Sequence, residues 1–271
     1  MPELPEVETS RRGITPHILG QTITGVVIRD HRLRWPIPKQ LATKATSQRI
    51  ERINRRGKYL LLETGTGCII IHLGMSGSLR ICAPDTPPVK HDHVDFVFGN
   101  GKALRLRDPR RFGAVLWTSN DPFKHKLLIQ LGPEPLGDEF NADYLHQQTR
   151  KRSASIKSVI MNSHVVVGVG NIYACEALFI AGINPKRKAG TLSKARCEKL
   201  VSAIRQILNA AIEQGGTTLR DFVREDGQPG YFKQHLYVYG RTDQPCLSCG
   251  TNIRQFTQQQ RSTFYCARCQ K

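Results

Sequence analysis

Four cysteines near the C-terminal end restrict the fold of this chain more than any other feature of its sequence. Cys246 and Cys249 form one Cys-x2-Cys pair, and Cys266 and Cys269 form a second pair after a hairpin-length segment. This layout is typical of a tetrahedral structural zinc site. Two disulfides are the alternative, but the other cysteines are scattered without pattern and the N-terminus does not resemble a signal peptide. We therefore predict one structural Zn²⁺ whose four thiolates leave no coordination position open for catalysis.

The charge of the chain indicates a polyanionic partner. Its 271 residues include 40 Lys and Arg against 22 Asp and Glu, which gives a formal net charge of +18. An excess of this size usually accompanies nucleic acid or an anionic membrane surface. The longest apolar stretch, residues 165–183, contains glycines, an asparagine and a glutamate, so it reads as buried helical material and not as a membrane span. We therefore expect nucleic acid as the partner, no membrane association, and the reducing conditions of the cytoplasm.

Hydrophobic patterning divides the chain into a strand-rich part and a helical part. From about residue 22 to residue 117, short β-branched or alternating runs are separated by Gly, Asn and Pro turns, a spacing that predicts a sandwich or barrel. A connector rich in Pro and Gly, residues 131–137, marks the boundary. Beyond it, apolar residues recur with helical periodicity. The expected helices span residues 142–149, 155–161, 171–181 and 193–214.

The N-terminus combines two prolines with two carboxylates and runs directly into a helical pattern. Pro5 suits a first helical position, and Gly13 is a suitable C-terminal stop. If Met1 is removed, the exposed group is the secondary amine of Pro2, beside the carboxyl group of Glu3. An α-amine has a pKa of about 7.7–8.0, so part of it is neutral and nucleophilic near neutral pH. On these residues alone a rigid helix start without chemistry is favoured, and a nucleophilic amine is the alternative.

A glycine-rich turn separates two of the expected helices. Residues 168–171, Gly-Val-Gly-Asn, place backbone N–H groups and the Asn171 amide at a helix N-terminus, which suits them to cradle a phosphate. Arg152 and Lys157 lie nearby in the sequence and add positive charge. A tight helix–helix turn that binds nothing is an equally good interpretation of these residues alone.

Further loops carry side chains suited to contact DNA. On the motif Asp-Pro-Arg-Arg-Phe-Gly, Arg110 and Phe112 lie on a tight turn and are suited to replace an extruded base. Met75 follows a glycine on what we expect to be an exposed loop tip, where it would act as an apolar wedge. His91 and His93 suggest metal ligands, but nothing in the sequence completes such a site, so we favour a phosphate contact for His91.

Taken together and in this order, the motifs resemble those of the formamidopyrimidine-DNA glycosylase family along the whole chain. Leu4 favours the purine-repair branch over the related endonuclease VIII type enzymes, which usually begin Pro-Glu-Gly-Pro. The matching segments are Pro-Glu-Leu-Pro-Glu-Val-Glu at residues 2–8, Arg-Gly-Lys-Tyr at 56–59, the loops at Met75 and at 108–112, the turn at 168–171 and the terminal zinc ribbon.

The resemblance implies an α+β multidomain fold and an enzymatic activity. A β-sandwich with a leading helix would span residues 1–131, a helix-two-turn-helix domain with a lesion-capping loop 132–238, and a zinc-finger hairpin 239–271. The implied enzyme excises oxidised purines such as 8-oxoguanine and formamidopyrimidines, and nicks the strand by β,δ-elimination as an AP lyase. Its partner would be double-stranded DNA with oxidised bases or abasic sites. We expect a monomer in a bacterial cytoplasm, acting at the nucleoid.

The resemblance also implies roles for individual residues. Pro2 would be the nucleophile that attacks C1′ and forms a Schiff base, and Glu3 the general acid/base. Lys58 would serve β-elimination and phosphate binding, and Arg261 δ-elimination. The loop at 217–231 would close over the extruded base. Contacts to the DNA backbone, the orphan base or the gap left by the lesion are implied for Met75, His91, Arg110, Phe112, Arg152 and Asn171, with Lys157 adding charge.

Two alternative functions stay open at this point. The first is an endonuclease VIII type enzyme that acts on oxidised pyrimidines. The second is a non-catalytic zinc-containing DNA-binding protein that keeps the same scaffold.

Overall fold

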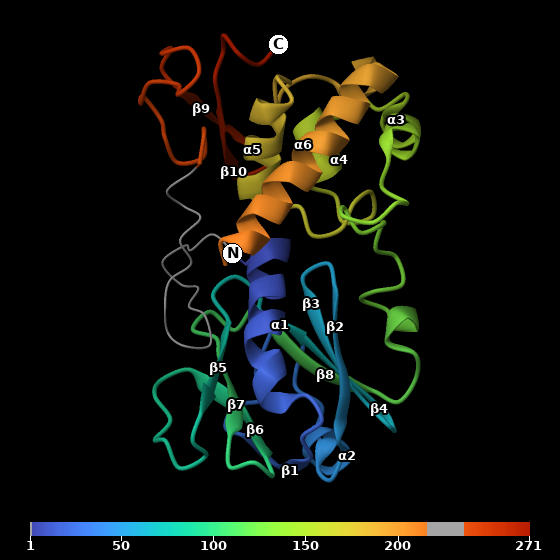
Figure 1. Ribbon diagram of the computed structural model, residues 1–271, viewed down its shortest axis with the longest axis vertical. Coiled ribbons are helices and arrows are strands. Elements are labelled where there is room, and N and C mark those ends of the chain that lie inside the picture. The colour runs from blue at the N-terminus through green and yellow to red at the C-terminus, as the bar shows by residue number, and fades with distance from the viewer. Residues whose placement is uncertain (1, 216–235) are drawn as a thin grey trace. The chain divides into compact units, whose positions relative to one another are not determined.

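The computed structural model describes residues 2–215 and 236–271 (Figure 1). These residues fall into two compact units, one formed by residues 2–129 with 214 and 215, the other by residues 130–213 with 236–271. The zinc ribbon is not separated from the second unit, so the three-domain division stays a prediction. Within the described residues, no helix combines the length and the apolar character that a membrane span requires.

The first unit is built on two antiparallel sheets of four strands each. A single apolar core holds residues of both sheets, such as Ile71 and Phe96. The predicted β-sandwich is therefore confirmed. In spatial order, the strands of one sheet are β1 (Ile23–Ile28), β6 (Asp92–Phe98), β7 (Ala103–Arg107) and β5 (Ser78–Cys82). The strands of the other sheet are β2 (Ile50–Arg56), β3 (Tyr59–Thr64), β4 (Gly67–His72) and β8 (Ala114–Thr118).

Helix α1 (Leu4–Ile18) leads the first unit and packs against β2 and β5. It continues past Gly13, so the predicted stop there is wrong. Ile14 and Ile18 are fully buried in the same core as Val7. Their burial outweighs the cost of about 1 kcal/mol that a glycine imposes inside a helix. The unit also contains the short helix α2 (Leu41–Ala45) and the 3₁₀ turn η1 (Pro122–Lys124).

The second unit is helical and carries the terminal hairpin. Helix α6 packs on α3 and α5, and strand β10 lies against α5 (Figure 1). A second apolar cluster, which includes Cys175, Phe179, Val238 and Phe264, joins α5 to the ribbon. Its elements are α3 (Ala142–Thr149), α4 (Ile156–Ile160), α5 (Asn171–Ile180), η2 (Ala189–Thr191), α6 (Lys194–Glu213), β9 (Arg254–Gln258) and β10 (Arg261–Tyr265).

Candidate active site and zinc centre

The start of α1 holds Pro2 and Glu3 in a defined position. Glu3 is the N-cap of the helix, and it forms a reciprocal capping box with Glu6. The Glu6 carboxylate accepts a hydrogen bond from the Glu3 backbone N–H at 2.8 Å, and the Glu3 carboxylate accepts one from the Glu6 N–H. Pro2 is buried, and Glu3 is only 2% exposed. The backbone directly after Pro2 is therefore fixed at the positive end of the helix dipole.

Lys58 lies on the tight turn between β2 and β3. Arg56 pairs with Tyr59 across the hairpin, so Gly57 and Lys58 form the two-residue loop, and Gly57 has a positive φ of 56°. Burial, followed by the charges of Lys58 and Arg34, lowers the pKa of His72 to about 4. The imidazole is thus neutral at pH 7, and its Nδ1 accepts a hydrogen bond from the Gly74 N–H at 3.0 Å.

The loops that carry Met75 and Phe112 are held together by the buried carboxylate of Asp108. One oxygen accepts a hydrogen bond from the Ser76 hydroxyl at 3.1 Å, and the other accepts one from the Gly113 N–H at 2.8 Å. The Ser76 oxygen in turn accepts one from the Arg110 N–H at 3.2 Å. Asp108 has no exposed surface. The two loops therefore form one local structure.

Close backbone packing completes this arrangement. Gly74 has a φ of 64°, and a Cβ there would lie 2.4 Å from the carbonyl carbon of Phe112. Phe112 is 41% exposed, and the Arg110 guanidinium carbon lies 4.9 Å from the centre of its ring. Met75 is half-buried, so the expectation of an exposed tip is wrong for this residue. The reason is that its loop packs against the backbone of the neighbouring loop.

The backbone of His91 is tied to the same region. His91 has a φ of 77°, and its carbonyl oxygen accepts a hydrogen bond from the Asp108 N–H at 3.0 Å. His93 is buried, and its Nε2 lies 2.9 Å from the Asp108 carbonyl oxygen. Among the described residues, the one group of three or more side chains placed to hold a metal consists of the four C-terminal cysteines. The alternative of a histidine metal site therefore finds no support there.

In the second unit, Asn171 and Lys157 both reach the terminal hairpin. Asn171 is the first residue of α5, and its amide donates to the Ser262 carbonyl oxygen at 2.9 Å. Lys157 on α4 is 2% exposed, and its ammonium donates to the Thr263 hydroxyl at 2.7 Å. These contacts connect the helices to β10. The phosphate contacts expected of both residues stay predictions, as does that of Arg152, which is half-buried and donates to the Gln148 side chain at 3.3 Å.

Arg261 is exposed at the first position of β10, directly after the hairpin turn. Gln258 and Arg261 pair across the turn, and the two residues between them, Gln259 and Gln260, have φ values of 47° and 58°. This is the backbone of a type I′ turn, which favours Asn and Gly because other residues are strained at positive φ. The strained turn lies directly beside the side chain that the resemblance assigns to δ-elimination.

Relieving this strain is expected to stabilise the ribbon. Replacing Gln260 with Gly should raise the free energy of unfolding by about 0.5–1 kcal/mol, because glycine adopts positive φ without a steric penalty. Thermal unfolding of the zinc-loaded protein measures the change. The matched control is Thr257→Gly on the adjacent strand, where glycine should lower stability instead. A fall in stability for Gln260→Gly would contradict this account of the turn.

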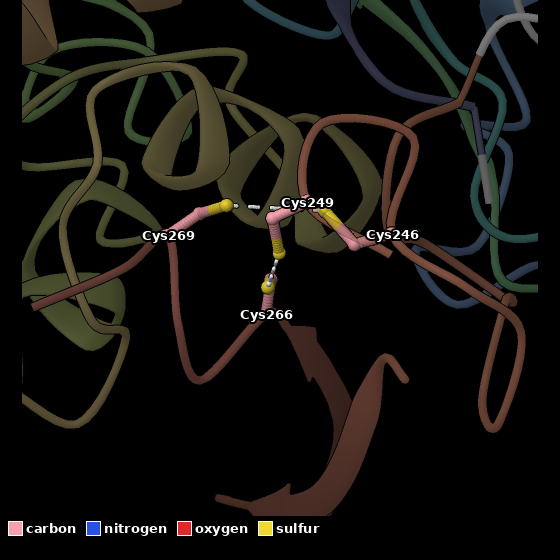
Figure 2. Close-up of side chains that lie close together, drawn as sticks. All are labelled: Cys246, Cys249, Cys266 and Cys269. Atoms are coloured by element: carbon pink, nitrogen blue, oxygen red, sulfur yellow. Dashed lines mark hydrogen bonds between the residues drawn. The ribbon is translucent and has the colours of Figure 1, made fainter. Parts of the chain in front are cut away.

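The four C-terminal cysteines form a site that fits zinc. Their Sγ atoms all lie within 4.8 Å of one another, with 3.9 Å between Cys246 and Cys269 and 3.5 Å between Cys249 and Cys266 (Figure 2). Tetrahedral ligation with Zn–S bonds of about 2.3 Å places sulfurs about 3.8 Å apart. A disulfide would require about 2.05 Å, and all four cysteines are free. The geometry therefore favours zinc over the disulfide alternative.

Comparison with known proteins decides the family. The formamidopyrimidine-DNA glycosylase N-terminal domain model matches residues 1–115, the H2TH domain model of the same family matches residues 131–223, and the zinc finger found in FPG and IleRS matches residues 243–271. The chain belongs to the formamidopyrimidine-DNA glycosylase family. It is therefore a DNA glycosylase of DNA repair with a zinc-finger domain.

Full-length relatives agree with this assignment. The formamidopyrimidine-DNA glycosylases of Thioalkalivibrio sulfidiphilus and Stutzerimonas stutzeri are 60% and 57% identical over 271 residues, which cover 100% of each chain. The MutM (FPG) crystal structure from Thermus thermophilus matches with a TM-score of 0.89 and 38% identity, covering 99% of this chain and 98% of that one. A Lactococcus lactis FPG mutant in complex with Fapy-dG containing DNA matches with a TM-score of 0.93 and 34% identity over 100% of both chains.

Several residues that shape this glycosylase site were missed from the sequence. The sequence predicted a rigid helix start, but not the reciprocal hydrogen bonds of Glu3 and Glu6 that fix it. Asp108 precedes a proline at the start of a turn, a position where Asp commonly accepts backbone hydrogen bonds. Nothing local marks Glu176, although its buried carboxylate accepts hydrogen bonds from three successive backbone N–H groups, at residues 237–239. The predicted capping loop at 217–231 lies outside the described residues.

Asp108 offers a direct test of the shared loop structure. Asp108→Asn should lower the free energy of unfolding by about 2–3 kcal/mol, because a buried charged acceptor of several hydrogen bonds is lost. Chemical denaturation measures the change. Asp85→Asn, an exposed site in the same unit, should stay within about 0.5 kcal/mol of the parent. Unchanged stability in Asp108→Asn would show that the carboxylate does not hold the two loops.

Proposed function

We propose that this glycosylase excises oxidised purines from DNA and then nicks the strand, with the amine of Pro2 as the nucleophile. The observation that carries the proposal is the fixed N-terminus. Pro2 is buried and is followed at once by a reciprocal capping box, so its nitrogen has one defined position. Such fixation also suits a helix start without chemistry, but an amine that must meet one sugar carbon requires it.

The chemistry follows from a secondary amine beside a carboxyl group. After removal of Met1, the Pro2 nitrogen attacks C1′, the glycosidic bond breaks, and the base leaves with the bonding electrons and gains a proton. Opening of the sugar ring then gives an iminium ion between Pro2 and C1′. Glu3 serves as the general acid/base for ring opening and proton transfer.

Strand scission follows from the same iminium. The positive nitrogen acidifies the C2′ protons, so loss of one of them expels the 3′ phosphate in β-elimination. A second elimination expels the 5′ phosphate. Lys58 is assigned to the first elimination and Arg261 to the second. Hydrolysis of the iminium finally returns Pro2 as a free amine.

DNA recognition is assigned to the positive charge of the chain and to the loops held by Asp108. Met75, Arg110 and Phe112 belong to one local structure, which suits them to fill the gap left by a flipped nucleotide. Extrusion costs a few kcal/mol and costs least at damaged pairs. Contacts to the DNA backbone are assigned to His91, Arg152 and Asn171. With such a substrate, we infer that the enzyme acts at the nucleoid in the bacterial cytoplasm.

Related structures support the substrate class. Lactococcus lactis Fpg has been crystallised with an abasic site containing DNA, and a mutant of it with Fapy-dG containing DNA. The same protein has also been crystallised with an oxidized pyrimidine containing DNA. An oxidised pyrimidine is therefore the second candidate substrate, and the experiment must separate the two.

Borohydride trapping on defined duplexes tests the proposal. We expect a covalent adduct on 8-oxoguanine DNA, a weaker one on DNA with an oxidised pyrimidine, and none on undamaged DNA. Mass spectrometry of the adduct peptide should place the bond on Pro2. An adduct on a lysine would refute the proposed nucleophile, and stronger trapping on the pyrimidine would refute the purine preference. Absence of any adduct would identify a binding protein without this chemistry.

A further inference from the structure

We propose that Arg55 is a positioning residue that fixes the Lys58 turn against the helix that begins at Pro2. The inference rests on the proposed roles of Pro2 and Lys58. Arg55 lies on β2, and its side chain is only 12% exposed. Its Nε donates to the Glu8 carboxylate at 3.2 Å, and its Nη1 donates to the Gly57 carbonyl oxygen at 3.0 Å. One guanidinium thus bridges α1 and the turn that carries Lys58.

The anchor on α1 is a carboxylate that stays ionised. Glu8 also accepts hydrogen bonds from Arg11 at 2.8 and 3.0 Å and from Arg12 at 3.0 Å. Burial would raise the pKa of Glu8, but the hydrogen bonds and charges of the arginines outweigh it and lower the pKa to about 2. The partner of Arg55 therefore keeps its charge at every pH at which the enzyme is assayed.

Attachment of α1 to the sheet does not by itself explain Arg55. Arg11 already makes that connection, because it binds Glu8 and donates to the Ile53 carbonyl oxygen at 3.2 Å. Arg55 also reaches the Gly57 carbonyl oxygen, a contact that Arg11 does not make. Burial of a guanidinium is unfavourable unless its hydrogen-bond partners are well placed. An additional positive charge near Glu8 is therefore not a sufficient reason for a third arginine there.

The contact between Arg55 and the Gly57 carbonyl oxygen can fix the position of the turn that carries Lys58. Gly57 has a positive φ of 56°, and glycine confers the largest conformational freedom of any residue. Binding of its carbonyl oxygen to a buried guanidinium restricts the turn, and so it restricts the backbone of Lys58. The Pro2 nucleophile and Lys58 are thereby held in a fixed position relative to each other. Small displacements of reacting groups lower the reaction rate strongly.

Arg52 provides a matched control on the same strand. It pairs with Glu63 across the hairpin at 2.9 Å, but its side chain is 72% exposed. Arg52→Met and Arg55→Met remove the same charge from β2, and only the second removes the bridge between α1 and the turn. Both variants lose one positive charge, so a difference between them does not come from the net charge of the chain.

A double-mutant cycle between Arg55 and Lys58 tests the inference, with single-turnover nicking of abasic DNA as the readout. We expect Arg55→Met to slow nicking at least tenfold with less than a threefold change in the Kd for DNA. Arg52→Met should change nicking less than twofold. In a Lys58→Met background, Arg55→Met should cost less than twofold, because the group that it positions is gone. A merely destabilising effect would multiply in both backgrounds.

The outcomes separate this inference from the proposed function. If Lys58→Met nicks at the parental rate, the assigned role of Lys58 fails. If Lys58→Met is impaired but Arg55→Met nicks like Arg52→Met, or slows nicking equally in both backgrounds, the positioning role of Arg55 is overturned. Should Arg55→Met not fold, Arg55→Lys carries the same expectation, since an ammonium keeps the charge but lacks the planar fork that binds two acceptors.

Discussion

A short extension placed before Pro2 is expected to abolish base release and strand nicking. An amide nitrogen is not nucleophilic, so a blocked Pro2 cannot form the iminium on which both steps depend. Loss of a covalent nucleophile costs orders of magnitude in rate, and we expect a fall of at least ~10³-fold in single-turnover nicking. The measurement uses duplexes with 8-oxoguanine and with an abasic site, so that both half-reactions are followed.

The matched control carries the same extension after Lys271. That protein should nick at the parental rate, because no assigned role falls on the last residue. A second variant, Pro2→Gly, keeps a free α-amine at the same position and should retain trapping by borohydride at a reduced rate. Parental nicking by the N-terminally extended protein would show that the nucleophile lies elsewhere.

Replacing the four zinc ligands is expected to remove the metal and unfold the ribbon. The change to serine at Cys246, Cys249, Cys266 and Cys269 leaves a small module with a limited apolar cluster. Structural zinc supplies about 10–16 kcal/mol in small domains of this kind, more than such a cluster provides. Elemental analysis should find one Zn²⁺ per parental chain and none in the variant.

Loss of the ribbon should also weaken DNA binding by at least about tenfold, because an ordered hairpin would no longer present Arg261 to the DNA. The contacts of Lys157 and Asn171 with β10 would be lost as well. The control is Cys82→Ser, which alters a cysteine outside the cluster and should leave zinc content and affinity unchanged. Stoichiometric zinc in the four-serine variant would show that these cysteines are not the ligands.

The first unit shows where sequence patterns did not suffice. Strand β2 was not predicted, because its sequence, Ile-Glu-Arg-Ile-Asn-Arg-Arg, has few apolar residues and no alternating pattern. It forms as an edge strand whose Arg52 and Asn54 side chains both bind Glu63 of the neighbouring strand. Cross-strand pairs of this kind stabilise a sheet without burying apolar surface.

Features that depend on residues close together in the chain were determined by the sequence itself. The two Cys-x2-Cys pairs predicted the zinc cluster, helical periodicity predicted α3, α4, α5 and α6, and the short β-branched or alternating runs predicted a sandwich or barrel. The order of the short motifs predicted the family. Each of these patterns consists of residue types at set spacings or in a set order along the chain, so it can be recognised without knowing the fold.

Only the tertiary structure decided which distant residues meet, around Pro2 and Lys58 in the first unit and around the terminal hairpin in the second. Arg55 and Glu8 are separated by 47 positions, Ser76 and Asp108 by 32, and Lys157 and Thr263 by 106. No local pattern encodes such pairs, because they form only once a helix has packed on a strand, two strands have paired, or the ribbon has packed on the helices. The sequence identified the candidate functional groups. The packing determined which side chains hold them in place.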